Sequence, residues 1–261
     1  MPELRHLSHS SVSTYASCGR LWQARYIEGL RGATTPPLLI GSVVDAVFER
    51  YLRAKVAGEA TPALSDLWQA TWLKHTTGER EASIDWQGEL PEKLENDGRR
   101  LIMFSGTLDL LNSLNPLVDP NGEPFLQRYV ELRIPGVPIP TIGYLDYIGE
   151  DLIPGDFKTS SSRWAEGRAR KELQPRIYLA ALLQAGFPLP RLAFRHWVWT
   201  KTKIPVIQEI ETEFTPAEIY HALEVVSKAW RGIQAGVFVP NSGYTYCNDS
   251  CPVWASCVGM R

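Results

Sequence analysis

The four cysteines of this chain lie at its two ends, and this placement limits the fold more than any other feature of the sequence. Cys18 stands near the start, and Cys247, Cys251 and Cys257 follow close to the end. A zinc ion or an iron–sulfur cluster held by cysteines takes four thiolates at one point, so such a site would bring the two ends of the chain together. Two disulfides are the alternative. The opening residues 1–10 lack the apolar core of a signal peptide, which favours a reducing compartment and a metal or cluster site.

Length and composition favour one elaborated domain. The 261 residues, 44% of them hydrophobic, are enough to bury a substantial core. The formal net charge of −2 excludes a globally basic protein, so a nucleic-acid site would have to be a local groove in a balanced surface. No apolar run approaches the ~20 residues that a membrane helix needs. We therefore expect a soluble cytoplasmic protein that makes no membrane contact.

Apolar residues at three- and four-residue spacing predict helices in the first part of the chain. The clearest helix is expected from Gly41 to about Ala57, where the spacing builds one apolar face. A helix ended by Gly29 is expected over residues 10–29, whereas residues 31–40 contain two prolines and are not expected to form regular helix. Two further helices are expected over residues 62–78 and 91–103.

Short β-branched or aromatic segments follow, and Pro and Gly separate them, which is typical of strands. A loop is expected over residues 116–124, and helices over residues 171–186 and 215–236. The strands are expected over residues 125–134, 141–150, 151–160, 191–201 and 205–214. This succession predicts an α/β fold in which helices flank a central mixed sheet.

Two of the nine tryptophans, Trp197 and Trp199, lie two residues apart in a predicted strand and therefore share one face. Arg195 and Lys201 flank them, so the pair could stack nucleic-acid bases. Burial in the core is favoured over this alternative, because large aromatic side chains stabilise proteins mainly by burial.

Asp146, Asp156 and Lys158 form the most informative polar group. Side chains alternate along a strand, so Asp156 and Lys158 point to the same face, and Asp146 could lie on the adjoining antiparallel strand. Two carboxylates on one rim suit a hard divalent cation such as Mg²⁺. The lysine could orient an attacking water and stabilise negative charge on a phosphoryl group. Taken alone, an Asp-x-Lys tripeptide is more often a surface ion pair.

Three further residues extend this group. Gln174 and Tyr178 are four residues apart and share a helix face, with the helix starting at or just before Pro175. Helix surface for the glutamine and core packing for the tyrosine are the alternatives. Asp45 lies on the flank of the apolar face of the helix that begins at Gly41, where a carboxylate is unusual without a partner.

The order of these residues resembles the PD-(D/E)XK nuclease superfamily, in the RecB-like and CRISPR-associated-exonuclease-like branch that carries a cysteine-bound 4Fe–4S cluster. The resemblance runs through SVSTYASCGRLW, GSVVDAVFE, GYLD, DFKT, QPRIY and CNDSCPVWASC. It implies one nuclease domain over residues 1–261 with a restriction-endonuclease-like core. Within it, the resemblance implies an N-terminal helical part (about 1–105), the nuclease core (about 106–236) and a C-terminal cysteine segment (237–261).

The resemblance also implies roles for the site residues. Asp146, Asp156 and the backbone carbonyl of Phe157 would hold Mg²⁺ or Mn²⁺, and Lys158 would serve the attacking water and the transition state. Gln174 and Tyr178 would position DNA or the lysine. The four cysteines would bind the 4Fe–4S cluster, with zinc as the alternative.

Two departures from the family pattern concern ligands. The branch usually has histidine where this chain has Asp45. A carboxylate at this position can still bind a metal, and it shifts the preference of the site toward harder ions. The late cysteines are spaced C-x3-C-x5-C, where C-x2-C-x5-C is common. Glu131, on the strand before Asp146, is either an additional metal ligand or an exposed strand residue. The five histidines show no ligand spacing and are interpreted as ordinary polar residues.

Basic residues near these motifs suit phosphate contacts, which do not depend on sequence, although a solvated surface would look the same. The candidate DNA-binding residues are Arg168, Arg170, Lys171, Arg176 and Lys201. The resemblance implies a metal-dependent DNA nuclease, with an exonuclease on single-stranded or unwound DNA favoured, in recombination, repair or phage- or CRISPR-type DNA processing. A helicase or recombination partner would fit this function. The alternatives are a weakly active or inactive DNA-end-binding adaptor and a structure-specific endonuclease.

Overall fold

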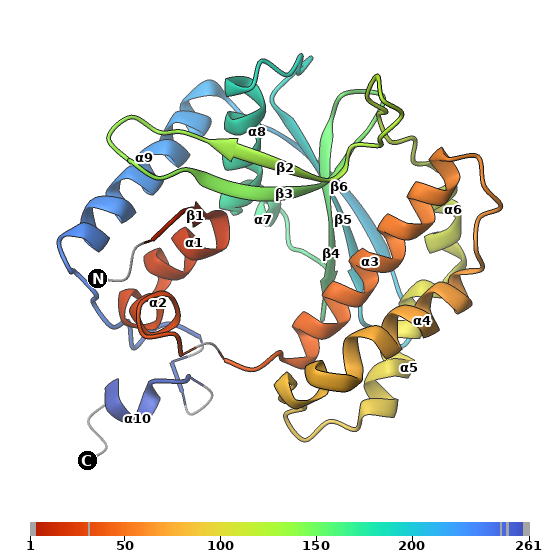
Figure 1. Cartoon of the computed structure of the whole chain (residues 1–261), viewed down its shortest axis with the longest axis horizontal. Helices are drawn as coiled ribbons and strands as arrows, with labels where there is room; N and C mark the ends of the chain where they lie inside the picture. The colour runs from red at the N-terminus through yellow and green to blue at the C-terminus, as the bar shows by residue number, and fades with distance from the viewer. Residues whose placement is uncertain (1–3, 31, 246, 249–250, 258–261) are drawn as a thin grey trace.

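The computed structural model describes residues 4–30, 32–245, 247–248 and 251–257. Within these residues a six-stranded mixed sheet has helices on both sides (Figure 1). The predicted α/β fold, with a central mixed sheet flanked by helices, is therefore confirmed. No helix in the described part of the chain is both long enough and apolar enough to cross a membrane.

The chain begins with β1 (Leu7–Ser8), α1 (His9–Ser17) and α2 (Gly19–Tyr26). The single helix expected over residues 10–29 is wrong, because Cys18 adopts an extended conformation, with φ −160° and ψ 106°, and separates two helices. A capping box at Ser8 and Ser11 starts α1. The break leaves the Cys18 side chain between the two helices rather than on a continuous helix face.

Helix α3 (Pro36–Val56) begins five residues before the predicted Gly41. Pro36 and Pro37 occupy its first turn, where the missing backbone N–H groups would have no partner within the helix. The expectation that residues 31–40 form no regular helix is therefore wrong for Pro36–Ile40. The apolar face of α3 is buried as its spacing predicts.

Helices α4 (Leu64–Thr76) and α5 (Pro91–Ile102) agree with the sequence patterns. A 3-10 turn (Gly78–Ser83) and helix α6 (Ser105–Ser113) were not expected. The α6 sequence is rich in Ser, Gly and Asn, which are poor helix formers. Tertiary contacts hold it in place, since the buried Thr107 hydroxyl donates to the Leu101 carbonyl and accepts from the Trp199 indole.

The strands expected from the sequence are all present: β2 (Leu126–Leu132), β3 (Thr141–Ile148), β4 (Pro154–Ser160), β5 (Ala193–Thr200) and β6 (Ile207–Glu213). The sheet order is β1-β3-β4-β5-β6, with β2 also paired to β3. Strands β4 and β5 run parallel, whereas β2–β3, β3–β4 and β5–β6 are antiparallel. Strands β3 and β4 pair only at Tyr147–Gly155 and Ile148–Pro154 and then separate, which opens the sheet next to Asp146.

The remaining helices lie later in the chain: α7 (Arg168–Lys171), α8 (Leu173–Gln184), α9 (Pro216–Gln234) and α10 (Trp254–Cys257). Helix α8 starts two residues before Pro175, as predicted. Helix α9 starts with a second capping box, formed by Thr215 and Glu218. Helix α10 lies near α2, so the described ends of the chain are neighbours in space (Figure 1).

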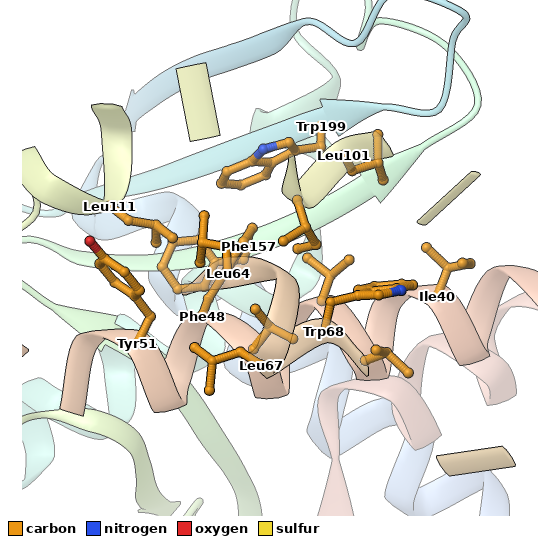
Figure 2. Close-up of a cluster of buried hydrophobic side chains, with 14 of the residues drawn as sticks. Ile40, Phe48, Tyr51, Leu64, Leu67, Trp68, Leu101, Leu111, Phe157 and Trp199 are labelled. Atoms are coloured by element: carbon orange, nitrogen blue, oxygen red, sulfur yellow. The ribbon is translucent and has the colours of Figure 1, made fainter. Parts of the chain in front are cut away.

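Two apolar cores lie on opposite faces of the sheet. One is formed with α3, α4, α5 and α6 and includes Phe48, Phe157 and Trp199 (Figure 2). The other is formed with α1, α8 and α9. Trp197 and Trp199 are fully buried in the first core, so the base-stacking alternative for these two residues is wrong and their burial in the core is confirmed.

Candidate active site

A cleft of about 320 Å³ opens where β3 and β4 separate. It contains all five predicted catalytic side chains together with Asp45. The β1–α1 junction, α3, β3, β4 and α8 supply its lining residues: Ser8, His9, Ser10, Asp45, Ile142, Gly143, Tyr144, Asp146, Asp156, Lys158, Gln174 and Tyr178.

Asp146 on β3 is held by two N–H donors. The Gln127 side-chain amide donates to Oδ1 at 2.9 Å, and the Phe157 backbone N–H donates to Oδ2 at 3.0 Å. Gln127 has φ 48°, in the left-handed region that non-glycine residues rarely adopt. The sequence analysis did not identify Gln127, because no local sequence pattern predicts a left-handed backbone conformation at a glutamine.

Asp156 on β4 is 1% exposed and has two partners from the predicted group. The Gln174 side-chain amide donates to Oδ1 at 2.7 Å, and Lys158 forms an ion pair with Oδ2. Asp156 and Lys158 therefore share one face, as the alternation of side chains predicts. Gln174 is buried against the carboxylate rather than placed on the helix surface.

Tyr178 on α8 joins the helix to β3. Its hydroxyl donates to the Tyr144 carbonyl at 3.0 Å. The ring passes directly over Gly143, where a Cβ atom would lie 2.5 Å from the ring carbon Cε1. A side chain at position 143 would displace the tyrosine, so the glycine is needed for this close approach. Burial raises the pKa of Tyr178 to about 12, which keeps the hydroxyl protonated as a donor.

If all three were ionised, the carboxylates of the cleft would carry more negative charge than one lysine can balance. Burial raises the pKa of Asp45 to about 7, with the Asp156 charge adding to the rise and Lys158 opposing it. Burial, Asp156 and Asp45 together hold the pKa of Asp146 well above its ordinary range. Burial would lower the pKa of Lys158, but the nearby carboxylates outweigh it and raise that pKa. Ionised together, these carboxylates need a further cation.

The chemistry of this donor set fits a divalent metal ion, since buried carboxylate oxygens are the ligands that Mg²⁺ and Mn²⁺ prefer. Among the described residues, however, no three His, Cys, Asp or Glu side chains are arranged as they would be around a metal. Lys158 engages Asp156, while N–H donors engage both oxygens of Asp146.

Two histidines lie at this site, although the sequence spacing marked neither. His9, in the first turn of α1, lines the cleft and packs edge-on against Tyr178, with ring centroids 5.7 Å apart. Burial, followed by the Lys158 charge, lowers the pKa of His9 to about 4. His196 on β5 is the strand neighbour of Asp156 and is fully buried. The capping signal at Ser8 could have located the start of α1, but not its docking beside β3.

Glu131 does not line the cleft. It lies on β2 opposite Ile142, accepts a hydrogen bond from the Tyr129 hydroxyl at 2.9 Å and pairs with Arg133 at 2.7 Å. Of the two candidates for the additional metal ligand, the structure brings Asp45 to the cleft and leaves Glu131 outside it.

None of the five predicted DNA-binding residues lines the cleft. Arg168 stacks over Trp164, and Arg170 pairs with Glu218 at 2.5 Å. Arg176 donates to backbone carbonyls at the start of α8, including that of Lys171, which is itself exposed. Burial lowers the pKa of Lys201. Structural bonds thus engage the three arginines, and phosphate binding by any of the five residues remains a prediction.

The four cysteines line one small cavity between α2 and the C-terminal segment. Cys18 comes from the break between α1 and α2, and Cys257 is the last residue of α10. All four are free thiols. Burial raises the pKa of Cys247, and the charges of Cys18, Cys257 and Cys251 add to the rise, in keeping with their closeness. Four thiols facing one cavity fit a cluster or zinc, although among the described residues they are not arranged as metal ligands.

Residues 6–258 match the sequence profile of the PD-(D/E)XK nuclease superfamily. The chain therefore belongs to this superfamily, whose restriction-endonuclease-like core agrees with the mixed sheet described above.

Comparison with solved structures supports the fold. A candidate exonuclease from Eubacterium rectale superposes with a TM-score of 0.58 at 15% sequence identity, over 95% of this chain and 87% of that one. A second structure, the protein SSO0001, gives a TM-score of only 0.33 at 14% identity, over 91% and 88% of the two chains. Among proteins of curated function, none matches the sequence significantly.

Proposed function

We propose that the protein is a Mg²⁺- or Mn²⁺-dependent deoxyribonuclease that acts as an exonuclease on single-stranded or unwound DNA. The observation that carries this proposal is the meeting of Asp146, Asp156 and Lys158 with Asp45 in one cleft at the opening of the sheet. Residues from α3, β3 and β4 come together there. Lys158 alone supplies too little positive charge to balance the three carboxylates when they are ionised.

The proposed roles combine the family resemblance with the positions of these residues in and around the cleft. Asp45, Asp146, Asp156 and the Phe157 carbonyl would hold the metal, which supplies charge neutralisation and a more acidic bound water. Gln174 fixes the orientation of Asp156 through its 2.7 Å hydrogen bond. Lys158 would orient the attacking water and stabilise the negative charge that develops on the phosphate.

The preference for exonuclease action is supported by the RecB-like order of the motifs. The related structure from Eubacterium rectale bears an exonuclease name and shares the fold, but that likeness concerns fold alone. A DNA-end-binding adaptor is disfavoured because the carboxylates and Lys158 are all present in the cleft. A structure-specific endonuclease is the other enzyme alternative.

We also propose that Cys18, Cys247, Cys251 and Cys257 bind a structural 4Fe–4S cluster, with zinc as the alternative. Support comes from the shared cavity and from the free thiols, which suit a reducing cytoplasm. A cluster of this kind would hold the two ends of the chain together. A helicase or recombination partner would supply unwound DNA to the nuclease.

The test compares end-labelled linear and circular single-stranded DNA, incubated with Mg²⁺ or Mn²⁺ and with a chelator as control. An exonuclease shortens the linear strand from an end and leaves the circle intact. Cleavage of the circle would replace the exonuclease proposal by the endonuclease alternative. Failure to cleave either DNA with any metal, in protein that still binds DNA ends, would favour the adaptor.

A further inference from the structure

Two large aromatic side chains are exposed beside the cleft. Tyr129 on β2 is 48% exposed and Tyr144 on β3 is 57% exposed. They are direct cross-strand partners, with ring centroids 5.8 Å apart and ring planes inclined by 65°. Neither ring belongs to either of the two apolar cores.

Tyr144 lies two residues from Asp146 on β3, and both residues line the cleft together with Ile142. At ~3.4 Å per residue, the Tyr144 position is about 7 Å from Asp146 along the strand. That distance corresponds to roughly two stacked nucleotides at ~3.4 Å each.

Neighbouring groups hold the backbone of Tyr144 and the side chain of Tyr129. The Tyr144 carbonyl accepts a hydrogen bond from the Tyr178 hydroxyl at 3.0 Å, which ties this part of β3 to α8. The Tyr129 hydroxyl donates to Glu131, which in turn pairs with the exposed Arg133. Because Tyr129 is held in this way, its side chain loses little further entropy when a flat ligand packs on it.

We propose that Tyr129 and Tyr144 form a base-stacking platform that holds unpaired bases of single-stranded DNA at the entrance to the catalytic cleft. This inference rests on the proposed nuclease function and names its substrate class. Aromatic rings bind bases of any sequence by stacking, because every base has a flat face. Bases within a duplex are already stacked on their neighbours, so the platform favours single strands over duplex DNA.

The experiment measures binding of a short fluorescent single-stranded DNA by anisotropy, with Ca²⁺ in place of Mg²⁺. The ring-deletion variants are Tyr129→Thr and Tyr144→Thr, since threonine suits a strand. We expect each to weaken binding about 5- to 150-fold, the usual range for one stacked base. Tyr129→Phe and Tyr144→Phe keep the rings and should retain most of the binding, although Tyr129→Phe also loses the hydrogen bond to Glu131. Tyr220→Ala removes an exposed tyrosine on α9 and is the matched control.

A second oligonucleotide carries abasic sugars in place of its bases. The platform predicts that wild type and ring-deletion variants bind this DNA with the same weakened affinity, since the backbone is unchanged. Equal affinity of wild type and threonine variants for the normal oligonucleotide would overturn the platform. So would an equal loss on the normal and the abasic oligonucleotide.

Photocrosslinking provides a readout in the wild-type protein, independent of whether the variants fold. DNA containing a halogenated uracil should crosslink to Tyr129 or Tyr144, as located by mass spectrometry, and crosslinks found only elsewhere would contradict the platform. The two proposals can be refuted separately. If the wild-type protein cleaves DNA but the two rings do not contribute to binding, the nuclease proposal stands and the platform is refuted. If the rings bind bases but no DNA is cleaved, the platform stands and the nuclease proposal is refuted.

Discussion

Lys158 differs from the other lysines of the chain because three carboxylates surround it and its ammonium pairs with a buried one. We predict that Lys158→Ala lowers DNA cleavage by ~100-fold or more, because charge stabilisation in the transition state is lost. DNA binding should largely survive, since the substitution leaves the cleft open. Single-turnover cleavage and anisotropy measure the two effects separately.

Lys228 supplies the matched control for this prediction. It is an exposed lysine on α9 that forms a helix-surface ion pair with Glu224. Lys228→Ala should cleave DNA at the wild-type rate, because exposed pairs of this kind contribute little. Near wild-type cleavage by Lys158→Ala would show that the site has been assigned wrongly.

Asp45 and Glu131 allow a paired test of the metal ligands. Asp45 lines the cleft whereas Glu131 pairs with Arg133 outside it. Asp45→Ala should therefore raise the Mg²⁺ concentration needed for half-maximal activity, and Glu131→Ala should leave it unchanged. Asp45→His should recover activity with Mn²⁺ better than with Mg²⁺, because imidazole suits the softer ion. Metal titrations that are equal for all of these proteins would refute the ligand role of Asp45.

The same carboxylate gives the protein a defined response to pH. Burial raises the pKa of Asp45 to about 7, so Mg²⁺ affinity should increase as the pH rises through that value and the carboxyl loses its proton. Because the folded-state pKa lies above the ordinary value, ionisation disfavours the folded state. Without metal, protonated Asp45 therefore stabilises the folded state at low pH, and this stabilisation is lost as the pH rises toward about 7.

Asp45→Asn separates these two effects of pH. It mimics the protonated side chain, so the metal-free variant should unfold at a higher temperature than the wild type above that pH, and Mg²⁺ should stabilise the wild type more than the variant. Thermal unfolding measured across pH, with and without Mg²⁺, tests both the stability difference between the metal-free proteins and the difference in their stabilisation by Mg²⁺. A variant that is less stable than the metal-free wild type above about pH 7 would contradict this account.

At the scale of secondary-structure elements, the contact between α2 and the C-terminal segment depends on a glycine. A Cβ atom at Gly19, the first residue of α2, would lie 2.9 Å from the Val239 backbone nitrogen and 3.0 Å from Cα of Phe238. Backbone atoms cannot rotate away as a side chain can. We therefore predict that Gly19→Ala destabilises the protein by ~1–3 kcal/mol, as overpacking typically does, measured by chemical unfolding.

Gly32→Ala is the control for this substitution. Gly32 is exposed, and no atom of the described residues lies within 4 Å of the place that a Cβ atom would take there. The alanine should be nearly neutral at this position. An equal effect of both substitutions would mean that the loss at Gly19 does not come from the contact with residues 238–239.

For the whole molecule, the four-cysteine cavity is one place where the early and late segments of the chain meet. We predict that anaerobically purified protein is brown and contains iron. Cys18→Ser and Cys257→Ser should each lose the iron and lower the thermal stability to a similar extent, because either removes one of four ligands. Iron analysis, visible absorption and thermal unfolding test this. A colourless protein with one zinc per chain would support the zinc alternative, and full iron retention by Cys257→Ser would contradict the site.

The sequence by itself determined strands β2 to β6, but not β1, and the common face of Asp156 and Lys158. Both depend on local rules, namely β-branched and aromatic segments bounded by Pro or Gly and the alternation of side chains along a strand. The start of α8 near Pro175 is equally local, because proline fits the first turn of a helix. Matching such motifs in order was also enough to predict the superfamily to which the chain belongs.

Only the tertiary structure decided which residues meet at the cleft and which faces are buried. Gln127 reaches Asp146 through a left-handed backbone conformation, and His9 enters the cleft because β1 docks beside β3. Trp197 lies in the core while Tyr144 is exposed, although both are aromatic residues on strands. Periodicity shows which side chains share a face, but the pairing of distant strands and the docking of helices determine whether that face meets the core or solvent.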